Sequence, residues 1–167
     1  SASKASADMI VRSFIKTYGL NSTISISSNN FGINQNKEKF IPKIIECIKA
    51  NKNIPLYGDG SNIRDWIYVK DHCKAIDVIF NNSQTGNVYN IGGENEITNL
   101  ELIDIISRII LKKNQYDVKI DFVSDRYGHD KRYSIDMTKF KNHFGWESNK
   151  DFVMELSNYI NDLSKEY

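Results

Sequence analysis

Residues 63–91 read IRDWIYVKDHCKAIDVIFNNSQTGNVYNI, and this stretch combines the two periodicities that decide the fold. Residues 63–68 predict a strand, residues 69–82 a helix, and residues 88–91 a second strand that stops at a glycine pair. Elsewhere we expect helices at 4–18, 37–51, 100–111, 136–144 and 150–164, and strands at 22–28, 54–58, 119–123 and 133–135. Strands that alternate with helices predict an α/β fold.

Local signals mark the ends of several of these elements. Gly19 is expected to end the first helix, and Thr98 with Glu101 forms a capping-box pattern at the start of another. Asp136 is expected to cap the short helix that ends at Phe144. Residues 29–32 are expected to leave their strand as a loop. No repeat, low-complexity tract or linker divides the chain.

Composition excludes several classes of function. The 167 residues are 40% hydrophobic, enough for one core, and a net charge of +1 with interspersed signs argues against nucleic-acid binding. No apolar run reaches transmembrane length. Cys47, Cys73 and the scattered histidines lack metal-ligand spacing, which predicts no metal site. We expect both cysteines to be reduced and buried, in a cytoplasmic protein.

The first residues read SASKAS and run into the first predicted helix. A Tyr placed before Ser1 would complete a Y-x-x-x-K motif with Lys4, and this spacing puts both side chains on one helical face. There the ammonium would lower the pKa of the phenol and make it an acid/base near neutral pH. A solvated lysine is the alternative for so short a motif.

No G-x-G-x-x-G pattern follows a predicted strand in these residues. A nucleotide-dependent enzyme with this element order is therefore expected to carry its dinucleotide fingerprint upstream of Ser1. Gly58, Gly60, Gly92 and Gly93 are expected to serve turns.

Polar residues gather at the ends of predicted elements, where α/β sheets bind ligands. The amides of Asn29 and Asn30 can hydrogen-bond a carbonyl and a sugar hydroxyl, although an Asn-rich turn is the alternative. Lys39 stands at a helix start, a position that favours phosphate. A solvated side chain is its alternative.

Two further stretches carry cations beside aromatic residues. Tyr57 can stack on a base, and Arg64 can hold a diphosphate, although a salt bridge from Arg64 to Asp65 is equally open. Residues 125–133 read DRYGHDKRY, a mixed-charge loop that suits an anionic sugar nucleotide better than a solvated turn.

Taken together, SASK, SNNFG, EKFIP, PLYGDGSNIRDWIYVKDH, YNIGG and DRYGHDKRY resemble, in order and spacing, the nucleotide-sugar 4,6-dehydratases of the extended short-chain dehydrogenase/reductase superfamily. The dTDP-glucose group of the rhamnose pathway is the most similar. The resemblance covers essentially the whole chain and implies the C-terminal half of such an enzyme. Residues 1–32 would be the last elements of the NAD-binding Rossmann domain. Residues 33–167 would be mainly the substrate-binding domain, with some strands returning to the Rossmann sheet.

The resemblance also implies roles for individual residues. Lys4 would be the catalytic-motif lysine that also binds the nicotinamide ribose, and Asn30 would lie near the nicotinamide end of NAD. The nucleotide-sugar contacts would be Asn29, Lys39, Phe40, Pro55, Leu56, Tyr57, Arg64, Asn90, Arg126 and His129.

In the family chemistry, the hexose is oxidised at C4, loses water across C5–C6 and regains hydride at C6, so that NAD acts as a bound catalyst. Family enzymes are commonly homodimers through a helix bundle, which implies a homodimer through residues 4–18. The chain alone is expected to be inactive, because the motif Tyr, the Asp-Glu acid/base pair and the NAD glycines are not in it.

Alternatives remain within and outside this chemistry. A 4-epimerase or UDP-sugar 4,6-dehydratase of the same superfamily is the nearest, and a non-catalytic sugar-nucleotide-binding module is the other. Residues 33–37 and Tyr127 depart from the family's pattern, in which Pro and aromatic residues are usual. These departures leave the base and the sugar open.

Overall fold

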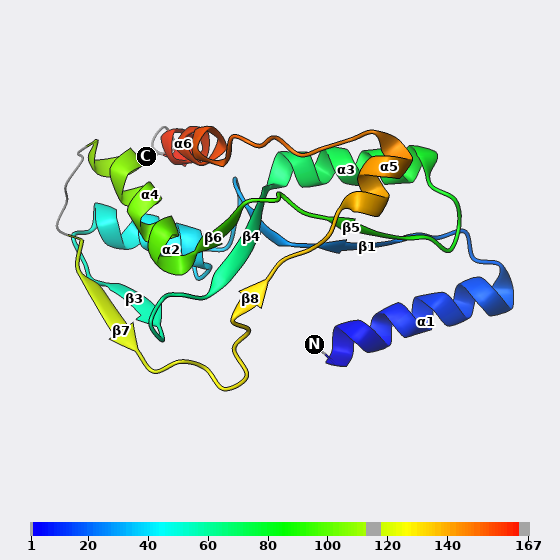
Figure 1. Ribbon diagram of the computed structural model, residues 1–167, viewed down its shortest axis with the longest axis horizontal. Helices are drawn as coiled ribbons and strands as arrows, with labels where there is room; N and C mark the ends of the chain where they lie inside the picture. Colours follow the sequence, from blue (N-terminus) through cyan, green and yellow to red (C-terminus); the bar gives the residue numbers. More distant parts are fainter. Residues whose placement is uncertain (1, 113–117, 164–167) are drawn as a thin grey trace.

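The computed structural model describes residues 2–112 and 118–163 and confirms the α/β class (Figure 1). The helices are α1 (Ala2–Tyr18), α2 (Phe40–Lys49), α3 (Val69–Asn82), α4 (Asn99–Leu111), α5 (Thr138–Phe144) and α6 (Phe152–Leu163). The strands are β1 (Ile24–Ser27), β2 (Asn29–Phe31), β3 (Ile54–Tyr57), β4 (Ile63–Tyr68), β5 (Val88–Ile91), β6 (Glu96–Thr98), β7 (Ile120–Val123) and β8 (Arg132–Tyr133).

The strands form small sheets rather than one continuous layer. β1 pairs with β5, and β3 pairs with β7, both in parallel. Strand β4 is parallel to β2 and β8 and antiparallel to β6. Strand β4 therefore lies beside β2, β6 and β8. Its first residues come near the loop before β8 (Figure 1).

The expectation of a loop at residues 29–32 is wrong for its first part, because Asn29–Phe31 forms strand β2. The Ser28 N–H donates to the Ile91 carbonyl at 3.0 Å, which completes the pairing of β1 with β5. One residue later Asn29 pairs with Trp66, so the extended chain changes partner from β5 to β4. Phe31 is buried, and its packing outweighs the turn preference of the asparagines.

Other element ends agree with the sequence. The Thr98–Glu101 capping box is present, with Thr98 Oγ1 accepting the Glu101 N–H at 3.1 Å. Gly19 is left-handed and ends α1. The predicted cap at Asp136 is displaced by one residue: the N-cap of α5 is Met137, and Asp136, just before it, accepts the Thr138 N–H at 2.8 Å. The predicted end of the last helix at residue 164 lies outside the described residues, and β6 was not predicted.

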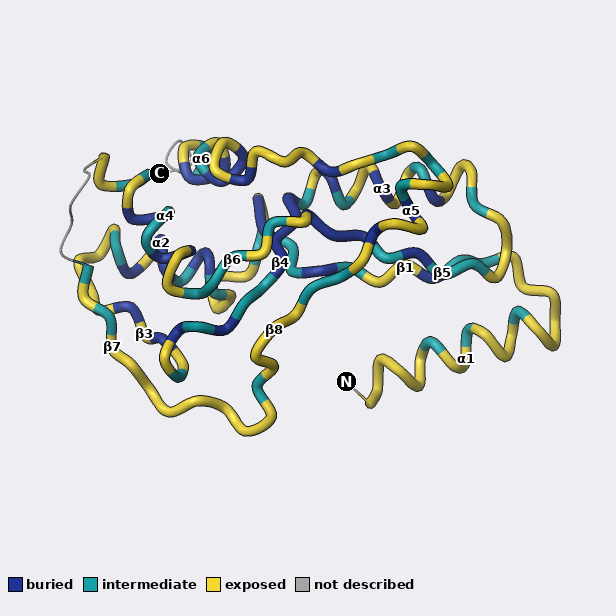
Figure 2. The backbone as a smooth tube through the Cα atoms, in the orientation of Figure 1, coloured by how far each residue is buried: buried dark blue, intermediate teal, exposed yellow. Residues whose placement is uncertain are grey.

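Two apolar clusters hold the described residues together. The larger joins α2, α4 and α6 to β3 and β4, and the smaller joins α3 and α5 to β5. The buried backbone in Figure 2 follows these elements. The larger cluster includes Trp66 and Tyr68 of β4, and its packing holds in place the elements that carry the candidate site.

Helix α1 stands apart from both clusters (Figures 1 and 2). It has no buried residue, and its side chains Met9, Ile10, Phe14 and Tyr18 are exposed. The described residues therefore leave an apolar helix face uncovered. Among the described helices, none has the length and hydropathy needed to cross a membrane.

The expectation of two buried thiols is half correct. Cys47 is buried on α2, whereas Cys73 is exposed on α3. Helix α3 buries Asp71, Ala75 and Ile79, so Cys73 falls outside its buried positions. Both cysteines are free thiols.

Candidate functional site

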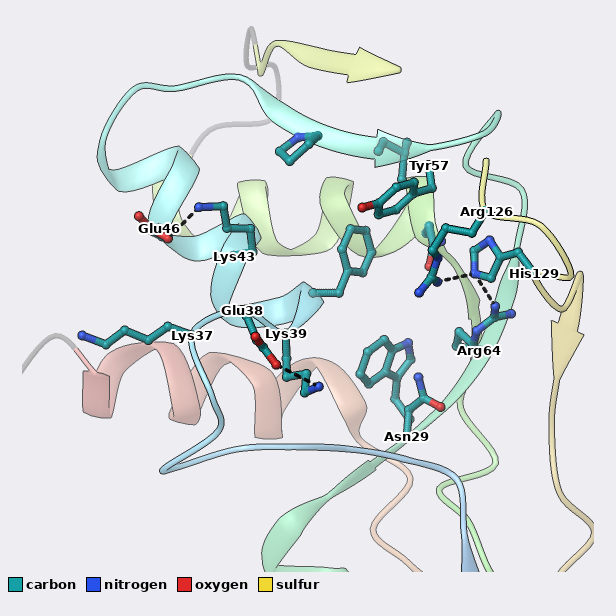
Figure 3. A pocket seen from close by; sticks show the side chains of 15 residues that line it. Asn29, Lys37, Glu38, Lys39, Lys43, Glu46, Tyr57, Arg64, Arg126 and His129 are labelled. Atoms are coloured by element: carbon teal, nitrogen blue, oxygen red, sulfur yellow. Dashed lines mark hydrogen bonds and ion pairs between the residues drawn. The ribbon is translucent and has the colours of Figure 1, made fainter. Parts of the chain in front are cut away.

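A cleft of about 720 Å³ opens between the start of α2, strand β3, the β2–β4 pair and residues 126–129 (Figure 3). Most of the side chains predicted to contact a nucleotide sugar line this one cleft. They are Asn29, Lys39, Phe40, Pro55, Leu56, Tyr57, Arg64, Arg126 and His129.

Two arginines converge on one histidine inside the cleft (Figure 3). Nη2 of Arg64 and Nη2 of Arg126 each lie 2.8 Å from Nε2 of His129. A guanidinium group only donates, so Nε2 is the acceptor of both bonds. The structure thus brings Arg64 from β4 together with Arg126 and His129 from the loop before β8.

The second ring nitrogen of His129 fixes its protonation state. Nδ1 lies 2.6 Å from Oδ1 of Asp125 and donates its proton there, which gives a neutral ring with Nε2 unprotonated. The hydrogen bond from His129 is the main cause that lowers the pKa of Asp125. Asp125 also accepts the Arg126 N–H at 2.8 Å.

Arg64 does not pair with its neighbour Asp65, the alternative left open by the sequence. The buried Asp65 carboxylate accepts the backbone N–H groups of Asn95, at 2.8 Å, and Gly93, at 3.2 Å. Burial raises the pKa of Asp65 above its usual value. Arg64 instead donates to the carbonyls of Ile63 and Asp130, at 2.7 and 2.8 Å.

The cleft therefore holds two cationic groups that neutral acceptors keep in place. Burial lowers the pKa of Arg64, Asp130 raises it, and Arg126 lowers it further. Among the described residues, neither Arg64 nor Arg126 forms an ion pair with a carboxylate. Two neighbouring guanidinium groups with spare donors make a binding place for a multivalent anion.

An aromatic wall borders the cations. The Arg126 guanidinium lies 5.0 Å from the centre of the Tyr57 ring, within the range of a cation–π contact. Tyr57, which Figure 3 shows beside Arg126, is half exposed, and Phe40, the first residue of α2, also lines the cleft. This wall offers flat apolar surface for a planar ring beside the anion-binding groups.

Asn30 lines a neighbouring cleft of about 530 Å³ that shares Asn29, Lys39, Phe40 and Trp66 with the first. Its amide nitrogen donates to Ser28 O at 3.2 Å, and its Oδ1 lies 2.7 Å from Nδ1 of His72. Burial lowers the pKa of His72, so a neutral ring donates this hydrogen bond. The Asn30 amide is thereby held in one orientation.

Two predicted residues do not reach either cleft. Lys4 is exposed on α1. Asn90, on β5, donates from its amide to the Asp136 carbonyl at 3.0 Å. The described residues also contain no group of three or more His, Cys, Asp or Glu side chains placed to hold a metal ion.

Sequence reasoning missed several residues that line the main cleft. They are Lys37, Glu38, Lys43, Glu46, Trp66 and Asn99. Asn99 begins α4 directly after β6, and because β6 was not predicted, no signal brought Asn99 next to β4. Trp66 is buried, and its Nε1–H has no acceptor among the described residues. A buried donor without a partner is uncommon in folded proteins.

Comparisons with known proteins show the family of this chain. The family model described as GDP-mannose 4,6 dehydratase matches residues 1–158. The low-salt glycan biosynthesis protein Agl12 of Haloferax volcanii is 46% identical over 152 residues, which cover 91% of this chain and 48% of that protein. The dTDP-glucose 4,6-dehydratase of Escherichia coli is 42% identical over 156 residues, which cover 91% of this chain and 43% of that enzyme.

A solved structure of a dTDP-glucose 4,6-dehydratase has the same fold as this chain. The dTDP-glucose 4,6-dehydratase of Bacillus anthracis, in complex with NAD, matches with a TM-score of 0.90 and 44% identity. The match covers 98% of this chain and 51% of that one. The chain spans about half the length of the relatives it matches. With the family model matching residues 1–158, the chain belongs to the GDP-mannose 4,6 dehydratase family.

Proposed function

We propose that the chain is the nucleotide-sugar-binding part of an NAD-dependent dTDP-glucose 4,6-dehydratase. The observation that carries this proposal is the convergence of Arg64 and Arg126 on His129, with Tyr57 beside them. The similarity to enzymes named as dTDP-glucose 4,6-dehydratases supports the choice of substrate.

In this proposal the diphosphate of the substrate binds to Arg64 and Arg126. Guanidinium groups form short charge-assisted hydrogen bonds to phosphate oxygens, and the partly desolvated cleft strengthens them. The base stacks against Tyr57, whose ring already faces one of these arginines. The hexose then extends past Asn29 toward the neighbouring cleft that contains Asn30.

Lys4 and Asn30 are this chain's proposed contacts to NAD. The exposed ammonium of Lys4 and the oriented amide of Asn30 suit the ribose hydroxyls and the carboxamide of that cofactor. NAD, when bound, supplies the hydride acceptor for oxidation at C4 of the hexose. Lys4 would lower the pKa of a neighbouring Tyr, so that this phenol takes the hydroxyl proton.

The remaining assignments rest on the same resemblance. Residues 1–32 would close the Rossmann domain, and residues 33–167 would form mainly the substrate domain. The uncovered apolar face of α1 supports a homodimer through that helix. We place the enzyme in the cytoplasm, in deoxysugar or rhamnose biosynthesis, and class it as a lyase.

An activity assay tests this function. The protein that carries this chain together with an N-terminal Rossmann half should convert dTDP-glucose to its 4-keto-6-deoxy product with bound NAD. Residues 1–167 alone should release none, because they lack the NAD fingerprint and the motif Tyr. Turnover of UDP-glucose but not dTDP-glucose by the complete protein would contradict the proposed substrate.

A further inference from the structure

His129 is the only group among the described residues that joins both arginines of the cleft. Its Nε2 can serve them both only while it carries no proton. Asp125, on the opposite side of the ring, is already placed to stabilise a charged imidazolium. The His129 ring is thus neutral in the free cleft, and Asp125 lies where it can stabilise the protonated ring.

We propose that a nucleoside diphosphate sugar entering this cleft makes His129 take up a proton from solvent, so that ligand binding and protonation of the ring are coupled. The proposal rests on the proposed function, because it requires a diphosphate at Arg64 and Arg126.

The first step is a competition for the arginine donors. A guanidinium group binds an anionic phosphate oxygen, which carries the opposite charge, more strongly than it binds the neutral Nε2 of His129. Arg64 and Arg126 therefore turn their Nη2 donors from His129 to the diphosphate. The His129 side chain is only 9% exposed, so its Nε2 is left as a buried acceptor facing an anion.

In the second step, the unpaired Nε2 of His129 gains a hydrogen-bond partner. A proton from water converts Nε2 into a donor that hydrogen-bonds a phosphate oxygen, while Nδ1–H keeps its 2.6 Å contact with Asp125. The imidazolium then lies between two anions, the ligand and the carboxylate.

The charges around the ring explain why protonation of His129 depends on the bound ligand. Arg64 on β4 and Arg126 on the loop disfavour an imidazolium, and Asp125 favours it. Asn62 is neutral, and its amide nitrogen lies 3.5 Å from Nδ1. The carboxylate of Asp130, which raises the pKa of Arg64, adds negative charge near the arginines. The two negative charges of the diphosphate offset the arginines and tip this balance toward the protonated ring.

Isothermal titration calorimetry of the chain with dTDP-glucose measures the coupling. Both phosphates of dTDP-glucose are esterified, so the probe itself has no proton that titrates near neutral pH. Titrations in phosphate-free buffers of different ionisation enthalpy should give apparent enthalpies that rise with the buffer's value, with a slope that approaches one proton taken up per ligand. Equal enthalpies in all buffers would overturn the coupling.

Variants assign the proton to His129. His129→Gln keeps an amide oxygen that accepts from both arginines but has no titrating group, so binding should weaken yet stay measurable and the buffer dependence should vanish. Asp125→Asn removes the stabilising charge and should reduce the slope. Asp121→Asn is the matched control, since Asp121 is an exposed carboxylate on β7 that bonds Asn53, and its slope should equal that of the unaltered chain.

The remaining outcomes also test the proposal. A buffer dependence that survives His129→Gln contradicts the proposal, although nucleotide binding would stand. If His129→Gln does not fold, the nitrogen chemical shifts of the His129 ring should move from the neutral to the protonated values on addition of dTDP-glucose, and unchanged shifts overturn the proposal. If dTDP-glucose does not bind the unaltered chain, the proposed function fails and the coupling fails with it.

Discussion

At the residue scale, Arg64 and Arg126 reach one cleft from segments that are far apart in the sequence. Both contact the same ring nitrogen of His129, and neither has a carboxylate partner among the described residues. A purely structural arginine pair would be expected to neutralise nearby carboxylates. The arrangement keeps positive charge available to a ligand instead.

This leads to a prediction for single alanine variants. Arg64→Ala or Arg126→Ala should each remove a charge-assisted bond to the diphosphate worth roughly 1.5–3 kcal/mol. The dissociation constant for dTDP-glucose should rise by about 10–150-fold in calorimetry. The melting temperature should stay nearly unchanged.

Arg132→Ala is the control for this experiment. Arg132 lies on β8 close to the cleft, but its guanidinium pairs with Glu96 at 2.6 Å. Its loss should leave nucleotide affinity as it was. If Arg64→Ala and Arg126→Ala lower the melting temperature and keep the affinity, both arginines serve the fold.

Gly93 gives a second prediction at this scale, on stability. A Cβ added there would lie 1.8 Å from the carbonyl oxygen of Trp66, a backbone atom of β4 that cannot move aside easily. Gly93→Ala should therefore destabilise the chain by about 3 kcal/mol in urea unfolding, at the upper end for overpacking. Gly128→Ala, where the new Cβ meets no atom within 4 Å, should cost only about 1 kcal/mol for its left-handed backbone.

At the scale of elements, a buried carboxyl pair joins α3 to α6. Asp71 and Glu155 are both buried, and Asp71 also holds Lys74 and the Asn149 N–H, each at 2.9 Å. Burial, reinforced by the charge of Asp71, raises the pKa of Glu155 to about 7. Despite burial, the hydrogen bonds from Lys74 and Asn149 lower the pKa of Asp71.

The sign of the resulting pH dependence follows from Glu155. The folded chain holds this proton more tightly than the unfolded chain, so the contribution of Glu155 is complete below its usual pKa of 4.5 and is lost as the pH rises to about 7. Asp71 acts below this window, where its contribution is lost as the pH falls. Urea unfolding should therefore show declining stability between these pH values.

Glu155→Gln should abolish that decline, because the amide is neutral throughout. Glu147→Gln is the control, since the pKa of Glu147 is lowered by Lys150 and Lys141 and it stays charged across the window. A decline that persists in Glu155→Gln would show that another group titrates.

Most elements were predictable because their periodicity is local. Strands β4 and β5 and helix α3 begin and end at the predicted residues, whereas β2 and β6 were missed. Each missed strand is three residues long, which is too short for an alternating pattern, and each exists because β4 supplies a partner. Their positions depend on contacts between distant segments that no local signal encodes.

The residues of the candidate site were likewise only partly predictable from the sequence. Tyr57, Arg64 and Arg126 were singled out by residue type, and the structure brings them to one cleft. Asn99 was missed because its place depends on β6, and Asn90 was included although it bonds Asp136 away from the cleft. The role of His129 as the shared acceptor of two arginines required the three-dimensional arrangement.

At the scale of the whole molecule, the described residues form a cleft and also leave one helix face uncovered. The cleft is lined by α2, β3, β4 and residues 126–129, whereas α1 leaves Met9, Ile10, Phe14 and Tyr18 uncovered. This contrast fits a chain that spans about half the length of its relatives. We therefore propose to test nucleotide-sugar binding on this chain itself, and turnover on a protein that also carries an N-terminal Rossmann half.

We expect this cleft to hold a nucleoside diphosphate sugar, and a crystal structure of the chain with dTDP-glucose would show whether it does. The expected result places the diphosphate between Arg64 and Arg126 and the thymine ring against Tyr57. A phosphate oxygen should replace the arginines at Nε2 of His129. A diphosphate bound outside this cleft, or a cleft that stays empty at saturating dTDP-glucose, would contradict the claim.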